Sequence, residues 1–404
     1  MRAGLNIRKQ IDKPVGGIPI WAIYLILALL FNAEIAIAGE GLPIARLNAD
    51  NIDQRLRYAH SLWEEGRTKP AIEEIEKQLA KDSTLLTDAA IILGGNYHLV
   101  RVTYNVFADR VGGFSPLGNK LVYARDTSMI RLDDGLFKWY EDRTTGIVYY
   151  DFDSANETTA EIPQANPLQP RFLDQQSFVY LAKDQAGAGT DAHYSLFVYD
   201  LKQKTTSECF TCYGSDYCVY QGGIVNYDES REMFTYRKPD GANERTLFDN
   251  DDWLSFKRPL PMIMNLSAGN DIILFEAGYQ FGKSGKNIYY LPISGGQPQI
   301  LSTNRQEYLS DGSFCPAAVN ANEYAFFNGR NDRIDIYYRV KGKDYQLTYD
   351  RGNKQYLTIS PVGDKIAYSY MIEKDGVESL EIFILDFSRD ATADDLMYRI
   401  KNIN

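Results

Sequence analysis

The stretch Phe114-Ser-Pro-Leu-Gly-Asn-Lys-Leu-Val-Tyr123 returns in outline late in the chain as Ile359-Ser-Pro-Val-Gly-Asp-Lys-Ile-Ala-Tyr368. Each copy holds an apolar residue, a Ser-Pro-x-Gly turn and a short apolar strand. Looser copies start at four further apolar positions, Phe172, Val225, Leu266 and Val319. The six starts are separated by 58, 53, 41, 53 and 40 residues. A period in this range indicates an array of similar small folding units.

A second apolar strand follows most of the six starts and is rich in β-branched and aromatic residues, which favour strands. These strands are Ile147–Phe152, Leu196–Leu201, Asn287–Ile293, Ile334–Tyr338 and Leu380–Phe387, and the third copy has only a degenerate counterpart near Thr246-Leu-Phe248. The spacing fits four short strands per unit. The predicted fold is mainly β: a six-bladed β-propeller over residues 97–404, preceded by a small α-helical hairpin over residues 39–96.

The ends of the propeller must meet so that no sheet edge stays open. Residues 102–105 resemble residues 347–350, yet no unit precedes them. We therefore expect residues 102–105 to pair with the last unit. The alternative closing strand is the C-terminal segment Met397-Tyr-Arg-Ile400.

Residues 1–38 have four basic residues, then an apolar run, then Ala36-Ile37-Ala38 before Gly39. This order is typical of a signal peptide cleaved between Ala38 and Gly39, which predicts a periplasmic or secreted protein. The alternative is a retained N-terminal membrane anchor, because the 19 uncharged residues from Val15 to Ala33 approach the length of a membrane span. No later segment of the sequence is long and apolar enough to span a membrane.

Cleavage removes four basic and two acidic residues, which leaves 39 Lys and Arg against 52 Asp and Glu, a net charge of −13. An acidic surface repels phosphate backbones and argues against nucleic acid as a partner.

The four cysteines are Cys209, Cys212, Cys218 and Cys315. Their spacing lacks the second close pair of a typical zinc site, and export favours disulfides. We expect one disulfide within Cys209 to Cys218, and the connectivity stays open.

Between Gly39 and the first strand, the apolar residues change to a helical period. One predicted helix carries Ile52, Leu56, Ala59 and Trp63 on one face, and a second carries Ile72, Ile75 and Leu79. Such a hairpin cannot be stable alone. It must pack on the propeller, on Leu85–Leu93 or on another protein.

The sequence contains few residues and motifs of the kinds that catalyse reactions or bind metals. The chain has three histidines, and neither a Gly-x-Ser-x-Gly nor a His-Glu-x-x-His motif is present. We therefore expect no catalytic residue, no metal and no cofactor. Calcium is the one cofactor that the alternative function, a ligand-binding or hydrolytic propeller, would use. The recurring Asp151, Asp200 and Asp386 each follow a strand, which indicates a turn role.

Aromatic residues fall into two classes. The pairs Tyr149-Tyr150, Tyr289-Tyr290 and Tyr337-Tyr338 recur at equivalent strand positions. Neighbours in a strand point to opposite faces, so each pair should pack on both sides of its sheet. Trp139, Tyr140, Trp253 and Tyr279 lie in predicted loops and are the candidate binding residues.

The two Ser-Pro-x-Gly elements resemble the repeat of TolB-type (PD40, WD40-like) propellers. Ala59, Leu62, Gly66, Ala71 and Ile75 fall where a tetratricopeptide repeat places its packing residues, so residues 50–83 resemble one such hairpin. The resemblance implies a non-enzymatic periplasmic or cell-envelope protein that offers a rigid scaffold to other envelope proteins. The alternative is a hydrolase or a carbohydrate or calcium binder that uses carboxylates at the central channel.

Overall fold

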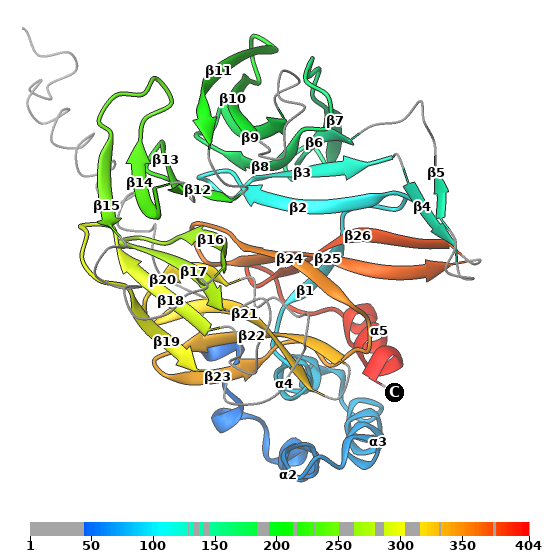
Figure 1. The fold of residues 1–404 in the computed structure, drawn as a ribbon. Helices are drawn as coiled ribbons and strands as arrows, with labels where there is room; N and C mark the ends of the chain where they lie inside the picture. Colours follow the sequence, from blue (N-terminus) through cyan, green and yellow to red (C-terminus); the bar gives the residue numbers. More distant parts are fainter. Residues whose placement is uncertain are drawn as a thin grey trace, which may run out of the picture. The chain divides into compact units, whose positions relative to one another are not determined.

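The computed structural model describes residues 44–127, 129–132, 137–139, 145–183, 194–212, 216–228, 231–249, 262–278, 287–303, 316–330, 333–374 and 377–403. Within these ranges the chain is mainly β, as expected, and its helices lie near the two ends of the described sequence (Figure 1). Residues 1–38, and with them the predicted cleavage site Ala38 and Gly39, lie outside the description.

All described strands except β4 and β5 form six four-stranded units, each an antiparallel sheet in itself. From the innermost strand outward, the first unit is β2 (Ala108–Phe114), β3 (Lys120–Asp126), β6 (Thr145–Asp151) and β7 (Asn156–Thr159), and the second is β8 (Leu168–Phe172), β9 (Ser177–Lys183), β10 (Tyr194–Asp200) and β11 (Thr205–Cys212). The third unit is β12 (Tyr217–Tyr220), β13 (Gly223–Asp228), β14 (Met233–Arg237) and β15 (Arg245–Asp249), and the fourth is β16 (Met262–Ala268), β17 (Ile272–Gly278), β18 (Asn287–Pro292) and β19 (Gln299–Thr303). The fifth unit is β20 (Ala317–Asn320), β21 (Glu323–Arg330), β22 (Arg333–Val340) and β23 (Lys343–Gln346), and the sixth is β24 (Lys354–Ile359), β25 (Lys365–Lys374), β26 (Val377–Asp386) and β1 (His98–Arg101).

Apolar clusters fill the seams between successive units. One cluster joins the first unit to the second, and further clusters follow in turn up to the seam between the fifth and sixth. A sixth cluster packs Val111 and Tyr123 of the first unit against Ala367 and Ile384 of the last. The units therefore close into a ring, which is the β-propeller arrangement.

The Ser-Pro-x-Gly element has the same geometry in the first and sixth units. In the first, Ser115 Oγ accepts a hydrogen bond from the Lys120 backbone N–H at 3.1 Å, and Gly118 closes the turn with φ of 68°. In the sixth, Ser360 Oγ accepts from Lys365 N–H at 3.0 Å, and Gly363 has φ of 75°. Glycine adopts this left-handed backbone without steric cost, which explains its place in the motif.

The third copy is shifted by one strand relative to the prediction. Val225 lies in β13, the second strand of its unit, whereas Phe114 and Ile359 each end an innermost strand. The innermost strand β12 is instead joined to β13 by a tight turn in which Gln221 and Gly222 both have positive φ. A two-residue turn replaces the Ser-Pro-x-Gly turn in this unit. The predicted start of the third copy, Val225, therefore corresponds to the second strand of the unit and not to the innermost one.

Strand β26 holds the ring closed. Strand β1 pairs with it antiparallel from His98 to Arg101, and the Val102 N–H then donates to the Ile382 carbonyl at 2.8 Å. This confirms closure by the N-terminal strand, although its paired residues begin four positions earlier than predicted. The first unit also reaches β26 through a parallel bridge between Ala108 and Leu380 and through strand β4 (Met129–Leu132), which pairs with β5 (Phe137–Trp139) (Figure 1).

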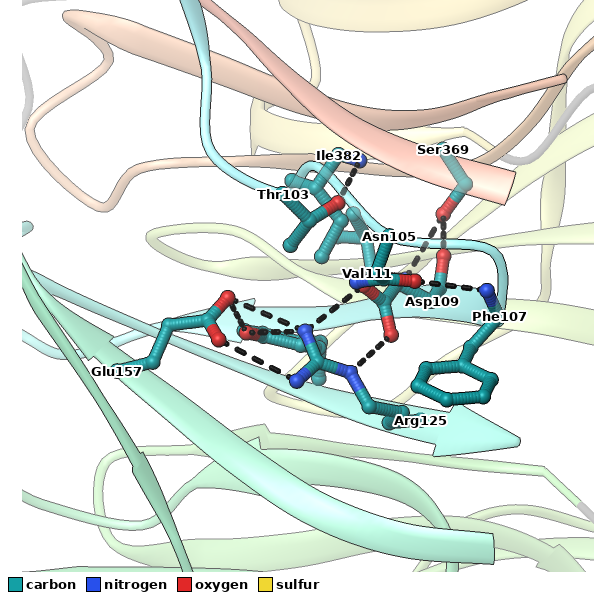
Figure 2. Close-up of polar contacts among 10 residues, drawn as sticks. Thr103, Asn105, Phe107, Asp109, Val111, Arg125, Glu157, Ser369 and Ile382 are labelled. Atoms are coloured by element: carbon teal, nitrogen blue, oxygen red, sulfur yellow. Dashed lines mark hydrogen bonds and ion pairs between the residues drawn. The ribbon is translucent and has the colours of Figure 1, made fainter. Parts of the chain in front are cut away.

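A polar network lies beside this closure (Figure 2). Asp109 is fully buried and accepts hydrogen bonds from Arg125 Nε at 2.7 Å and Arg125 Nη2 at 3.0 Å, and from Asn105 at 2.7 Å. Its backbone carbonyl accepts from Ser369 Oγ of the sixth unit at 2.8 Å. Arg125 also pairs with Glu157, so one guanidinium joins the inner and outer strands of the first unit.

The helices form a separate small core. They are η1 (Ile44–Arg46), η2 (Ala49–Asn51), η3 (Gln54–Leu56), α2 (Arg57–Glu64), α3 (Thr68–Leu79), η4 (Ser83–Leu85), α4 (Leu86–Ile92) and α5 (Ala393–Ile403). The predicted apolar faces of the hairpin meet in one cluster with α4 and α5, although Ile52 and Leu56 precede helix α2. The hairpin thus packs on residues 85–93, one of the expected partners, and on the C-terminal helix.

Residues 397–400, the alternative closing strand, lie in helix α5. Thr392 and Asp395 cap this helix, because the Thr392 N–H donates to Asp395 Oδ2 at 2.7 Å and the Asp395 N–H donates to Thr392 Oγ1 at 3.2 Å. Asp395 also accepts from the Leu99 N–H at 3.0 Å, which ties the helix to β1.

Both structural interpretations of recurring residues are confirmed. Asp151 Oδ1 accepts from the N–H groups of Asp153 and Ser154, and Asp200 and Asp386 make equivalent turn contacts. The members of each tyrosine pair pack in different seams: Tyr337 lies between the fourth and fifth units, and Tyr338 between the fifth and sixth.

Candidate functional site

The candidate functional site is the channel at the centre of the ring. Residues from all six innermost strands, or from the turns that follow them, line a cavity of about 330 Å³. The two Ser-Pro-x-Gly turns contribute Pro116 and Pro361, so the motif that sets the fold also builds the mouth of this channel. A volume of this size lies in the range typical of ligand and peptide sites.

The lining of the cavity is mostly apolar or uncharged. Phe114, Leu173, Val219 and Ile359 lie among glycines and small polar residues. The described lining contains no Asp or Glu, and the alternative function required several carboxylates there. Beside the mouth, Leu117 is 69% exposed, which is unusual for a leucine in a short turn.

Arg171 is the one charged side chain in the described lining. It comes from β8 and also lines a second, smaller cavity together with Val111, Asn265 and Tyr356, so it lies where the two cavities meet. Arg171 Nη1 donates to the Gly112 carbonyl at 2.5 Å, while Nε is buried and has no hydrogen-bond partner among the described residues. A buried guanidinium N–H without a partner favours a ligand that brings an acceptor.

Asp216 lies close enough to Arg171 for the two charges to attract each other. Desolvation raises the pKa of Asp216 to about 6, although the Arg171 charge and backbone N–H groups, including that of Leu266 at 3.2 Å, favour the ionised form. A buried carboxyl group that titrates just below neutral pH therefore lies near Arg171, although it is not part of the described channel lining.

The raised pKa makes a prediction about stability. The folded protein holds the Asp216 proton more tightly than the unfolded chain, whose carboxyl has a pKa near 3.8. The contribution of Asp216 is therefore most favourable below pH 4 and is lost as the pH rises to about 6. Relative to the wild type, Asp216→Asn should gain up to about 3 kcal/mol in free energy of unfolding between pH 4 and pH 7.

Urea unfolding of both proteins at several pH values measures this difference. Asn retains an acceptor for the Leu266 N–H, so the variant should fold. A stability difference that does not change between pH 4 and pH 7 would contradict the raised pKa.

The sequence-predicted binding aromatics do not lie in the described channel lining. Trp139 ends strand β5, opposite Met129, and its side chain is outside the described part of the structure. Tyr140, Trp253 and Tyr279 also fall outside the described residues, so their binding role stays a prediction.

The cysteines do not form the expected disulfide within Cys209 to Cys218, because Cys209, Cys212 and Cys218 are all free thiols. Cys209 and Cys212 lie three residues apart on strand β11, a separation of about 10 Å that exceeds the reach of a disulfide. Burial raises the pKa of Cys209 to about 11 and that of Cys212 to about 12, so both stay protonated. Cys315 lies outside the described residues.

Sequence reasoning missed Arg171 and Asp216. Arg171 stands in the short strand Leu168-Gln-Pro-Arg-Phe172, and Asp216 stands in a Cys-rich loop. No motif surrounds either residue. The ring gives them their environment, because it brings Arg171 of β8 near Asp216 at the start of β12.

No family of protein sequences and no curated protein matches this chain. Among solved structures it is similar to an oligogalacturonate lyase from Vibrio parahaemolyticus, with 11% identity and a TM-score of 0.40 over 71% of this chain and 93% of the other. It is similar to the β-propeller domain of the Trilobed protease from Pyrococcus furiosus, with 11% identity and a TM-score of 0.40 over 70% and 82%. It is also similar to TolB from Acinetobacter baumannii, with 13% identity and a TM-score of 0.38 over 67% of each chain.

The described residues contain no group of three or more His, Cys, Asp or Glu side chains arranged to hold a metal ion. They also contain no helix with the length and apolar character needed to cross a membrane.

Proposed function

We propose that the protein is a non-enzymatic cell-envelope scaffold whose channel receives a segment of a partner protein. The supporting observation is the channel itself, which combines an apolar wall with one half-buried cation, Arg171, whose Nε is buried. A peptide can place apolar side chains against Phe114 and Leu173 and a carbonyl or carboxylate oxygen against Arg171 Nε.

The proposal also covers the export of the protein to the cell envelope. Residues 1–38 act as a signal peptide, the mature protein is periplasmic or secreted, and its partners are other envelope proteins. Residues 39–96 and 97–404 are the proposed helical and propeller domains. No nucleic acid is a partner of so acidic a chain.

Site-specific photocrosslinking tests the proposal. A photoreactive amino acid replaces Leu117 at the mouth and, in a control, the exposed Glu244 between β14 and β15. Crosslinking in intact envelopes should give one discrete protein adduct from position 117 and none from position 244. Arg171→Gln should weaken capture of that partner about tenfold, which is the loss of one charged hydrogen bond.

Two outcomes would count against the proposal. The first is equal labelling from positions 117 and 244, and the second is an adduct that Arg171→Gln leaves unchanged. Turnover of a small substrate that depends on Asp216 would favour the enzymatic alternative.

A further inference from the structure

A second concave site lies away from the channel, between the first and second units. It is an open groove of about 370 Å³. Its walls come from the start of β3, from β6, β7 and the turn between them, and from the turns β8–β9 and β10–β11. Lys120 pairs with Asp151 across β3 and β6, so these turns lie on the same side of the ring as the channel mouth.

The side chains of the groove are of one chemical kind. Amides and hydroxyls dominate, from Ser154, Asn156, Thr158, Gln175 and Gln176. Such groups both donate and accept hydrogen bonds. A ligand that matches them must also do both, as the hydroxyl groups of a sugar do.

The charged residues of the described groove lining are two lysines and one carboxylate. Lys120 Nζ lies 3.5 Å from Asp151 Oδ2, and Lys202 is an exposed cation at the opposite wall. Hydrogen bonds from the Ser154 and Asp153 N–H groups and the Lys120 charge outweigh desolvation and hold the pKa of Asp151 below its usual value, so this side chain stays ionised. An ionised carboxylate disfavours phosphate and accepts readily from a hydroxyl.

One amide in the groove has an unmet hydrogen bond. Gln175 Nε2 is buried and has no partner among the described atoms. Leaving such a donor unpaired costs about 1–3 kcal/mol, and a ligand oxygen would remove that cost. The half-buried Tyr149 adds an aromatic surface of the kind that polyhydroxylated ligands commonly cover.

We propose that this groove binds a short, uncharged stretch of a glycan. Peptides fit it less well, because Leu201 and the Tyr149 ring are its chief apolar surfaces. Together with the channel mouth, the groove places a sugar-binding and a protein-binding surface on one side of the ring. The inference does not depend on the function proposed for the channel.

The test uses the full chain and an array of soluble neutral and acidic oligosaccharides, followed by calorimetric titration of the best neutral sugar. Inorganic phosphate and an acidic tripeptide are titrated in parallel. We expect a neutral oligosaccharide to bind with a Kd below about 1 mM. Asn156→Ala and Gln175→Ala should each weaken it about tenfold.

Lys204→Ala is the matched control. Lys204 is exposed in the same β10–β11 turn as Lys202 but does not line the groove, so its loss should leave the Kd unchanged. Because Asn156 is exposed, its variant should keep its fold, which its thermal unfolding verifies. The proposal is overturned if no neutral sugar binds, if phosphate or the peptide binds instead, or if the groove variants bind sugar as well as the wild type.

Discussion

Asp109→Ala is expected to lower the free energy of unfolding by about 3–5 kcal/mol, the usual cost of removing one partner from a buried ion pair. The substitution removes the acceptor of Arg125 Nε and the acceptor of Asn105 (Figure 2). The backbone carbonyl of residue 109, which alanine keeps, accepts from Ser369 of the sixth unit, so the lost side-chain contacts lie beside the closure of the ring. Urea unfolding followed by circular dichroism measures the loss.

Glu161→Ala is the control for this effect. Glu161 pairs with Lys204 on the surface at 3.3 Å, and both side chains are more than half exposed. Exposed pairs contribute about 0–1 kcal/mol. If the two variants lose similar stability, the Asp109 network does not hold the closure.

Gly112→Ala should destabilise the protein by about 3 kcal/mol or more, because overpacking against backbone cannot be relieved by a rotamer change. A Cβ at this position would lie 2.1 Å from the Pro170 carbonyl oxygen and 2.7 Å from that of Val122. The first and second units would have to separate. Since Arg171 donates to the Gly112 carbonyl, the channel should change as well.

Gly146→Ala is the matched control. Gly146 lies in strand β6 of the same unit, and a Cβ there meets no atom within 4 Å. Alanine in a strand is favoured over glycine by about 0.5–1 kcal/mol, so this variant should be as stable as the wild type or slightly more stable. Thermal unfolding of the pair gives the comparison, and equal midpoints would refute the steric argument.

The sequence predicted those parts of the fold that depend on local rules. The turns at Ser115 and Ser360 require glycine at one position, and the tyrosine pairs follow the two-residue period of a strand. The third unit was misaligned because Gln221-Gly222 makes a different turn that carries no copy of the motif. The C-terminal helix could have been recognised from Thr392-x-x-Asp395, a capping pattern that the strand hypothesis for residues 397–400 overlooked.

The candidate site could not be predicted from local sequence patterns. Arg171 and Asp216 are ordinary charged residues in sequence, and they become unusual only where the ring removes them from water. The groove likewise combines turns from two units. In both sites, residues that lie far apart in the sequence come together only in the folded ring. A sequence motif therefore could not indicate either site.

The closure at β26 has a consequence for biosynthesis. Arg101 and its partner Glu381 are 280 residues apart, and a ribosome needs roughly 15–60 s to make that length of chain. During this interval the first unit can pack on the second but lacks its neighbour in the sixth unit, and the ring cannot close. We expect cells to keep it bound by chaperones until the last strand is made, and slow synthesis to promote aggregation.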